Sequence, residues 1–70
     1  MQNYKITLPA VRVNAGLTQE ELARKMEVSR ATIINWENGT TKINKASLTL
    51  FADICNFPVE LIFLPYQFTK

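Results

Sequence analysis

The sequence predicts an all-α fold, a compact bundle of about five short helices within a single domain that spans residues 1–70. Apolar residues recur at intervals of three and four in four successive segments, which is the spacing of an amphipathic helix. A helix-capping residue precedes each of these segments, and Gly or Pro follows most of them. Strand patterns are weak throughout, although residues 66–68 suit a weak pairing with residues 4–6.

The first helix is predicted within residues 7–16. Thr7 is a suitable N-cap, and Pro9 falls in the first turn, where its missing N–H group is harmless. Gly16 provides a C-terminal stop, because glycine readily adopts the left-handed conformation that ends many helices. The residues expected to share one face are Leu8, Val11 and Ala15.

The second helix, in residues 17–27, has the strongest local signal of the chain. Thr18 and Glu21 form a T-x-x-E capping box, in which each side chain bonds a backbone N–H group of the other residue. After about two turns of helix the chain reaches Ser29, a second capping residue, which leaves about two residues for the turn. The expected buried stripe is Leu22, Ala23 and Met26.

The third helix is predicted in residues 29–39. Ile33 and Trp36 point to one side and are expected to pack in the core, while Asn38 and Gly39 end the helix with residues that tolerate left-handed backbone. Four residues are left facing elsewhere, and they are Arg30, Ala31, Ile34 and Asn35.

Asn44 is a plausible cap for a fourth helix in residues 45–56, and Pro58 begins a last short helix in residues 58–63, before a tail at 64–70. The core face of the fourth helix is expected to contain Leu48, Phe51, Ala52 and Cys55. This stripe cannot also hold all of Leu50, Ile54, Phe57 and Leu61, so some of these four are expected to form a second apolar face. That face either mediates a dimer or folds over the tail to complete a monomeric core.

The composition argues against an enzyme, a metal protein and a membrane protein. The chain has no His and a single Cys, so we expect no disulfide within the chain, no metal site and no cofactor. Asp53 and Glu60 fall on different short elements and give no acid–base pair. The absence of a long apolar run and of a signal-peptide pattern predicts a cytoplasmic protein. The net charge of +2 is too small to indicate a polyanionic partner by itself.

The stretch from Leu8 to Phe63 resembles the lambda-repressor-like helix-turn-helix domain, the Cro/Xre family of DNA-binding regulators. The residues that carry the resemblance are Arg12, "LTQEELARKM", "VSRATIINWENG" and "LFADICNFPVELIF", with the helix-turn-helix at about residues 18–38. The chain has Glu27 where the family usually has Gly in the turn, and Ile43 where Pro is common. A non-glycine residue at positive φ costs of order 1 kcal/mol, so we expect a strained turn at Glu27.

The resemblance implies that the helix beginning at Ser29 enters the major groove of double-stranded DNA. The Arg30 fork suits guanine O6 and N7, and the Asn35 amide suits adenine N6 and N7, while Ala31 and Ile34 can pack on thymine methyl groups. The alternative for Arg30 and Asn35 is that they are ordinary solvated side chains.

Other positions match family positions that contact the phosphate backbone, which fixes register and carries no sequence information. These are Gln19, Ser29, Thr32, Thr41, Lys42 and Lys45. Lys42 and Lys45 are alternatively ordinary solubilising charges. Arg12 and Glu37 look like a partly buried ion pair that the family uses to join the first helix to the end of the third.

These features lead to the hypothesis of a Cro/Xre-type transcriptional repressor from a phage or mobile element, which binds a pseudo-palindromic operator as a homodimer. Seventy residues leave little room for a separate effector domain, so occlusion of a promoter is the expected mechanism. The alternative is an antitoxin-like or adaptor module whose main role is to bind a protein partner through its apolar C-terminal surface.

Overall fold

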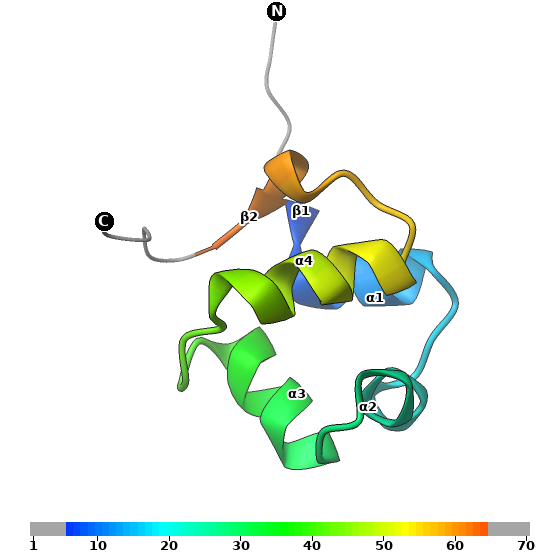
Figure 1. Cartoon of the computed structure of the whole chain (residues 1–70), viewed down its shortest axis with the longest axis vertical. Coiled ribbons are helices and arrows are strands. Elements are labelled where there is room, and N and C mark those ends of the chain that lie inside the picture. Colours follow the sequence, from blue (N-terminus) through cyan, green and yellow to red (C-terminus); the bar gives the residue numbers. More distant parts are fainter. Residues whose placement is uncertain (1–5, 65–70) are drawn as a thin grey trace, which may run out of the picture.

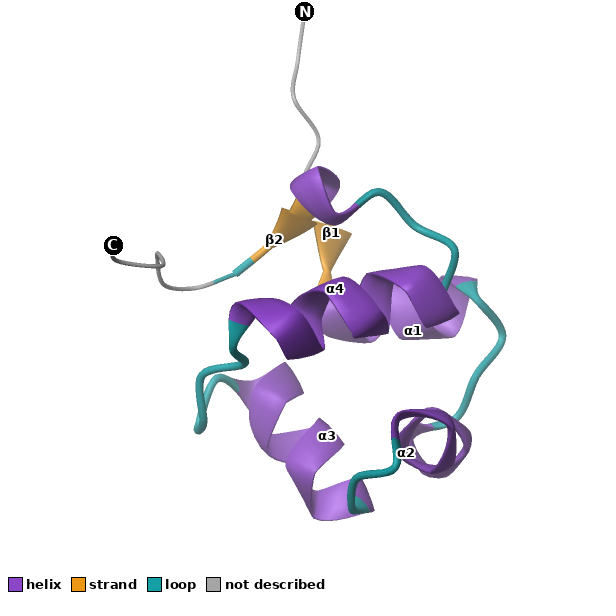
Figure 2. Cartoon of the chain, viewed as in Figure 1, coloured by secondary structure: helices purple, strands orange, loops and turns teal. Residues whose placement is uncertain are grey.

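The computed structural model describes residues 6–64, and it confirms the all-α class (Figures 1 and 2). Four short helices form most of this part of the chain, and two short strands and one 3₁₀ turn complete it. In chain order the elements are β1 (Ile6–Thr7), α1 (Leu8–Asn14), α2 (Gln19–Met26), α3 (Arg30–Asn38), α4 (Lys45–Ile54), the 3₁₀ turn η1 (Val59–Leu61) and β2 (Ile62–Phe63).

The elements are distributed along the long axis of the molecule. Helices α2 and α3 pack against each other at one end of the long axis, whereas β1, β2 and η1 lie at the opposite end (Figure 1). Helices α1 and α4 lie between these two ends. The pair α2–α3 is therefore presented at one end of the molecule, away from the strand pair.

The predicted fifth helix at residues 58–63 is wrong. Only a single 3₁₀ turn forms, and the chain then becomes extended, so that Ile62 pairs with Ile6 and Phe63 with Thr7 in a parallel register. One helical turn is intrinsically unstable, and here the extended chain buries the Ile62 side chain to 6% exposure in the core. The weaker expected pairing of residues 66–68 with residues 4–6 lies outside the described residues, except for Ile6.

All four predicted N-caps are confirmed. The side chains of Thr7, Thr18, Ser29 and Asn44 accept hydrogen bonds from Ala10, Glu21, Thr32 and Ser47 backbone N–H groups, at 3.4, 3.0, 3.1 and 2.8 Å. The Thr18 backbone N–H donates to the Glu21 carboxylate at 2.9 Å, which completes the capping box and lowers the pKa of Glu21. Short helices gain much of their local definition from these bonds, because they satisfy backbone donors that the helix leaves unpaired.

Three helices end in the same way, with a residue in left-handed conformation followed by an apolar residue. Gly16, Glu27 and Asn56 have φ values of 76, 60 and 55°. After each of them, the backbone N–H of the next residue reaches back to the helix, from Leu17 to Arg12, from Val28 to Ala23 and from Phe57 to Ala52. This is the Schellman arrangement, and its apolar residue packs against the core in each case.

The predicted core faces of the helices are confirmed with one exception. Ala15 is exposed, because α1 ends at Asn14 and the chain turns away at Ala15. Ile43, in the loop before α4, is fully buried, so the residue that replaces the family's common proline belongs to the core. Burial also raises the pKa of the free Cys55 thiol, as expected for a cysteine that serves in packing. The buried residues of the described chain are Leu8, Val11, Leu22, Ala23, Met26, Ile33, Trp36, Ile43, Leu48, Phe51, Ala52, Cys55 and Ile62.

Glu27 carries the left-handed conformation (φ 60°, ψ 42°) without the steric freedom of glycine. We therefore expect Glu27→Gly to raise the free energy of unfolding by about 0.5–1 kcal/mol, after allowance for the added flexibility of the unfolded chain. Urea unfolding followed by circular dichroism measures this change. The matched control is Lys25→Gly in the same helix, which should lower stability by about 1 kcal/mol. A loss of stability in Glu27→Gly would contradict the assignment of strain.

Candidate nucleic-acid interface

Helix α3 separates its core residues from a second group that faces outward. Ile33 and Trp36 are buried, at 0 and 8% exposure, and they hold the helix against the rest of the fold. The four residues expected to contact bases do not belong to this core, and they are Arg30 and Ala31, which are exposed, and Ile34 and Asn35, which are half-buried. A helix anchored on one side therefore offers a mixed polar and apolar surface on the other.

The turn between α2 and α3 is short and well determined. It contains Glu27, Val28 and Ser29, and its shape follows from the Schellman end of α2 and the N-cap of α3. Val28 packs against the core between these two points. The Ser29 hydroxyl also bonds the Thr32 hydroxyl at 2.9 Å, which ties the first turn of α3 together. The hydrogen bonds at the two helix ends and the packing of Val28 thus define the course of the turn.

The expected ion pair between Arg12 and Glu37 is present. Arg12 Nε donates to Glu37 Oε2 at 2.6 Å, and the two side chains are only 13 and 4% exposed. A second guanidinium nitrogen of Arg12 donates to the Leu17 carbonyl oxygen at 2.9 Å, in the loop before α2. One arginine in α1 thereby bonds both the end of α3 and the entry to α2.

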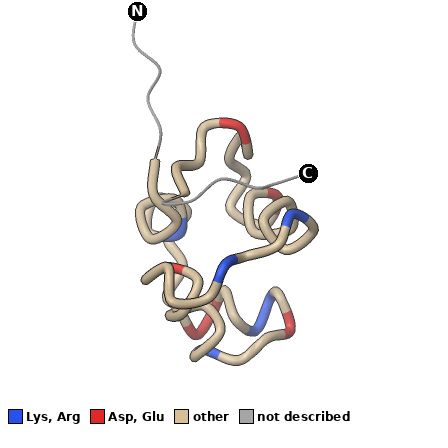
Figure 3. The backbone as a smooth tube through the Cα atoms, turned by 90° about the vertical axis from the view of Figure 1, so that its left-hand side faces the viewer, with Lys and Arg blue, Asp and Glu red and all other residues tan. Residues whose placement is uncertain are grey.

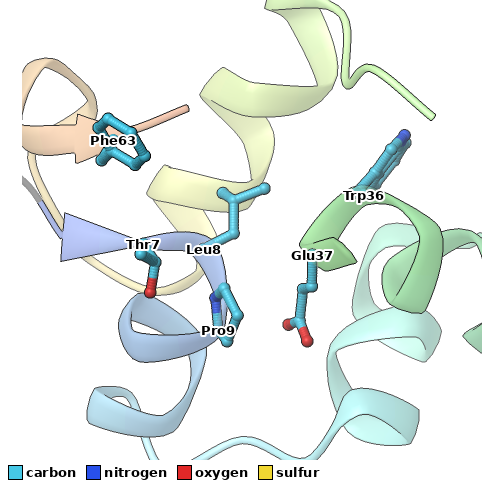
Figure 4. A pocket seen from close by; sticks show the side chains of 6 residues that line it. All are labelled: Thr7, Leu8, Pro9, Trp36, Glu37 and Phe63. Atoms are coloured by element: carbon cyan, nitrogen blue, oxygen red, sulfur yellow. The ribbon is translucent and has the colours of Figure 1, made fainter. Parts of the chain in front are cut away.

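The Glu37 side chain has little contact with water and borders a small hollow with several apolar residues. Figure 4 shows it extending from α3 away from the Trp36 ring, beside Leu8 and Pro9 at the start of α1. These residues line a small hollow of about 110 Å³ that Thr7 and Phe63 complete. A carboxylate in such surroundings requires close hydrogen-bond donors, because loss of water around a charge is costly.

A further donor to Glu37 comes from α2. Gln19 Nε2 donates to Glu37 Oε1 at 3.0 Å, while Gln19 Oε1 accepts a longer hydrogen bond, at 3.4 Å, from the Arg30 guanidinium. Gln19 was expected only as a phosphate contact, and the sequence gives no signal of these two bonds, which join residues 11 and 18 positions apart. Tertiary packing brings Arg12, Glu37, Gln19 and Arg30 into one connected group.

The remaining expected phosphate contacts lie around the two ends of α3. Ser29 and Thr32 are at its first turn, where the helix dipole favours an anion. Thr41, Lys42 and Lys45 follow its last turn, and all three are exposed. The Thr41 backbone N–H donates to the Asn35 carbonyl oxygen at 3.2 Å, which holds the start of this loop against the helix.

Basic and acidic residues occur in nearly equal number in this chain. Figure 3 shows basic and acidic residues interspersed along the backbone of the described chain. The sequence has eight Lys and Arg against six Asp and Glu, in agreement with this picture. A balance of this kind gives no strong electrostatic preference for a polyanion by itself.

Comparison with known families supports a specific assignment. A family model described as helix-turn-helix matches residues 10–62, from the first turn of α1 to the start of β2. Searches of curated proteins and of solved structures gave no match. Within residues 6–64, every helix is too short or too polar to cross a membrane, and His, Cys, Asp and Glu form no cluster suited to a metal ion.

The Glu37 carboxylate holds donors from α1 and α2, so its removal should be costly. We expect Glu37→Ala to lower the free energy of unfolding by about 3 kcal/mol, because the half-buried Arg12 guanidinium loses its counter-charge. Chemical denaturation followed by circular dichroism measures the loss.

The double replacement Arg12→Met with Glu37→Leu is the control for this prediction. It should cost less than the sum of the two single changes, since it leaves no unpaired charge behind. A loss below about 1 kcal/mol in Glu37→Ala would instead indicate the weak coupling of a surface ion pair.

Proposed function

The chain belongs to the Cro/C1-type helix-turn-helix family of DNA-binding regulators, and from this premise we propose that it is a sequence-specific transcriptional repressor. It binds a pseudo-palindromic operator by inserting α3 into the major groove and represses by occupying the promoter. The observation that carries the proposal is the exposed Arg30 at the start of α3, beside a helix face that the core does not use.

Four residues of α3 are proposed to contact base edges. Arg30 presents a planar fork to guanine O6 and N7, and Asn35 presents an amide to adenine N6 and N7. Ala31 and Ile34 provide apolar contact with thymine methyl groups on the same face. Each good bidentate contact contributes about 1–3 kcal/mol of discrimination between bases.

Phosphate contacts are proposed at both ends of this helix, where they set its register on the duplex. Ser29 and Thr32 lie at the helix N-terminus, which favours anions, and Thr41, Lys42 and Lys45 lie in the loop and the first turn of α4. Because these contacts are largely electrostatic, binding should weaken as the salt concentration rises.

A homodimer is proposed to bind the two half-sites of the operator about one helical turn apart. Of the apolar residues expected at the interface, Leu50 and Leu61 are 43 and 38% exposed, whereas Ile54 and Phe57 are half-buried against the core. Phe63 adds a further exposed apolar side chain, at 48%. The leucines, with Phe63, are thus the accessible part of the proposed dimer surface.

The same exposed side chains favour a second candidate function. Val59, Leu61 and Phe63 all lie on the short C-terminal elements, where an apolar surface suits a protein partner. An antitoxin-like or adaptor module would use this surface as its main binding site and would need no base-specific contacts on α3. Sequence preference in DNA binding therefore distinguishes the two candidates.

Selection of bound fragments from sheared source DNA, at near-physiological salt, tests the repressor proposal. We expect a symmetric site for the parent protein and a loss of preference at one base pair per half-site for Arg30→Ala, equivalent to about 1–3 kcal/mol. The matched control is Arg24→Ala, which removes the same charge from an exposed position of α2 and should retain the preference. Weak, sequence-independent recovery by the parent protein would favour the adaptor function.

The proposed dimer surface is tested by Leu50→Lys, which places a charge on an exposed apolar position of α4. We expect the association constant of the dimer, measured by sedimentation equilibrium, to fall by at least tenfold, since a charge at a packed interface loses its water. Val13→Lys is the control, because Val13 is 62% exposed on α1 and is outside the proposed surface. Equal effects of the two changes would contradict the proposed interface.

A further inference from the structure

The outward side of α3 places apolar side chains beside polar ones. Ile34 follows Arg30 by four positions and Ala31 by three, so these three side chains are neighbours on the helix surface. Arg30 and Ala31 are exposed, and Ile34 is half-buried. Within residues 6–64, Ile34 belongs neither to the buried core nor to the partly buried side chains that pack against that core. Its branched apolar group therefore lies next to the arginine on the surface proposed to read DNA.

The chemistry of Ile34 limits what it can recognise in the major groove. Thymine presents the O4 acceptor and the C5-methyl group there, and cytosine presents the N4 amino donor. The Ile34 side chain has no donor or acceptor, so it cannot tell O4 from the N4 amino group by a hydrogen bond. It can only gain from burying the methyl group, which leaves water on contact. 5-Methylcytosine presents a methyl group at the same ring position as thymine.

We propose that Ile34 reads the C5-methyl group itself, so that 5-methylcytosine takes the place of thymine at the base pair that Ile34 contacts. The DNA partner then includes sites that carry a methyl group at C5 of cytosine. Methylation of a cytosine at this position strengthens binding. The inference rests on the proposed function, and it adds a modified base to the ligands of the same surface.

The position of Ile34 on the helix indicates which base pair is affected. Replacing a T·A pair by a 5-methylcytosine·G pair also replaces adenine by guanine, which a side chain that bonds adenine would reject. Asn35, the residue proposed to bond adenine, is separated from Ile34 by about 100° around the helix, whereas Arg30 is separated from it by only about 40°. The exchange is therefore expected at the pair next to the guanine that Arg30 contacts.

The neighbouring arginine tolerates this exchange of purines. The guanine that pairs with 5-methylcytosine presents only the acceptors N7 and O6 along its major-groove edge, whereas adenine presents a donor at N6. A guanidinium donates hydrogen bonds and accepts none, so Arg30 meets no like group on the new guanine. The methyl group is then the feature of this base pair that decides the affinity.

The test begins by locating the base pair. Selection of bound fragments with Ile34→Ala identifies the pair at which this variant loses preference. Duplexes of the selected operator then carry thymine, deoxyuridine, cytosine or 5-methylcytosine at that pair in both half-sites, with adenine opposite the first two and guanine opposite the others. Deoxyuridine keeps the hydrogen-bonding groups of thymine and lacks only its methyl group. Fluorescence anisotropy at one salt concentration measures the affinity of the protein for each duplex.

We expect the parent protein to bind the thymine and 5-methylcytosine duplexes with affinities that agree to within about twofold, and to bind the deoxyuridine and cytosine duplexes about tenfold more weakly, since one buried methyl group is worth about fourfold in each half-site. In Ile34→Ala the difference between methylated and unmethylated duplexes should fall below about twofold. The matched control is Val13→Ala, which shortens an apolar side chain that is 62% exposed on α1 and should keep the parent's order. Circular dichroism melting checks that each variant is folded at the assay temperature.

Several results would overturn the inference, and they differ in what they leave standing. If Ile34→Ala loses preference at no base pair, or if the duplexes with and without the methyl group bind equally, Ile34 does not read the methyl group. If thymine binds tightly and 5-methylcytosine weakly, the purine of this pair is read and the two bases are not equivalent. In both cases the proposed function survives when Arg30→Ala still loses preference at its own base pair. If the parent protein shows no base preference at all, the proposed function fails and the inference fails with it.

Discussion

Burial of the Glu37 carboxylate is the constraint on which the arrangement of the first three helices depends. At 4% exposure this side chain has lost nearly all contact with water, and a charge in that state is tolerated only with close donors. Arg12 supplies them from α1 and Gln19 from α2, so the two helices must approach the end of α3 together. The Arg12 bond to the Leu17 carbonyl extends the same control to the loop between α1 and α2.

Helix ends supply the second constraint, since helices of 7–10 residues have little stability of their own. Each begins with a side-chain cap, and three end with a left-handed residue followed by an apolar one that packs on the core. The apolar residue matters because it turns a local chain reversal into a tertiary contact. Gly16 and Asn56 suit this conformation, whereas Glu27 does so at a conformational cost.

Much of the fold could be predicted because its signals are local. Capping residues act within three positions of the helix start, and the apolar stripes repeat at helical spacing, so the four helices and most of their core faces follow from the sequence alone. The outward set on α3 follows by elimination from the same periodicity. The burial of Ile43 and the parallel pairing of Ile62 with Ile6 could not be predicted in this way, because both depend on contacts between distant parts of the chain.

In the candidate site, too, some features could be predicted from the sequence and others depend on contacts between distant residues. The Arg12–Glu37 pair was expected from a family resemblance, but the two bonds of Gln19 become visible only when α2 and α3 are packed together. No short motif encodes a glutamine that donates to one helix end and accepts from another. The phosphate role expected for Gln19 came from its match to a family position at the start of the second helix, and such a match does not reveal the partners of a side chain within this chain.

The modest net charge of +2 bears on how much a single proposed base contact, that of Arg30, would contribute to DNA binding. Strongly basic DNA-binding proteins gain much of their affinity from phosphates, whatever the sequence. Basic and acidic residues are interspersed along the described backbone of this chain (Figure 3), so we expect it to gain less from that source and the proposed base contacts to form a larger share of the binding free energy. In the proposed complex, the base contact of Arg30 would then supply much of the contribution that distinguishes one sequence from another. The Glu37 carboxylate, which accepts hydrogen bonds from Arg12 of α1 and Gln19 of α2, thereby connects the packing of the helices to the surface proposed to read DNA, because Gln19 also accepts a hydrogen bond from Arg30.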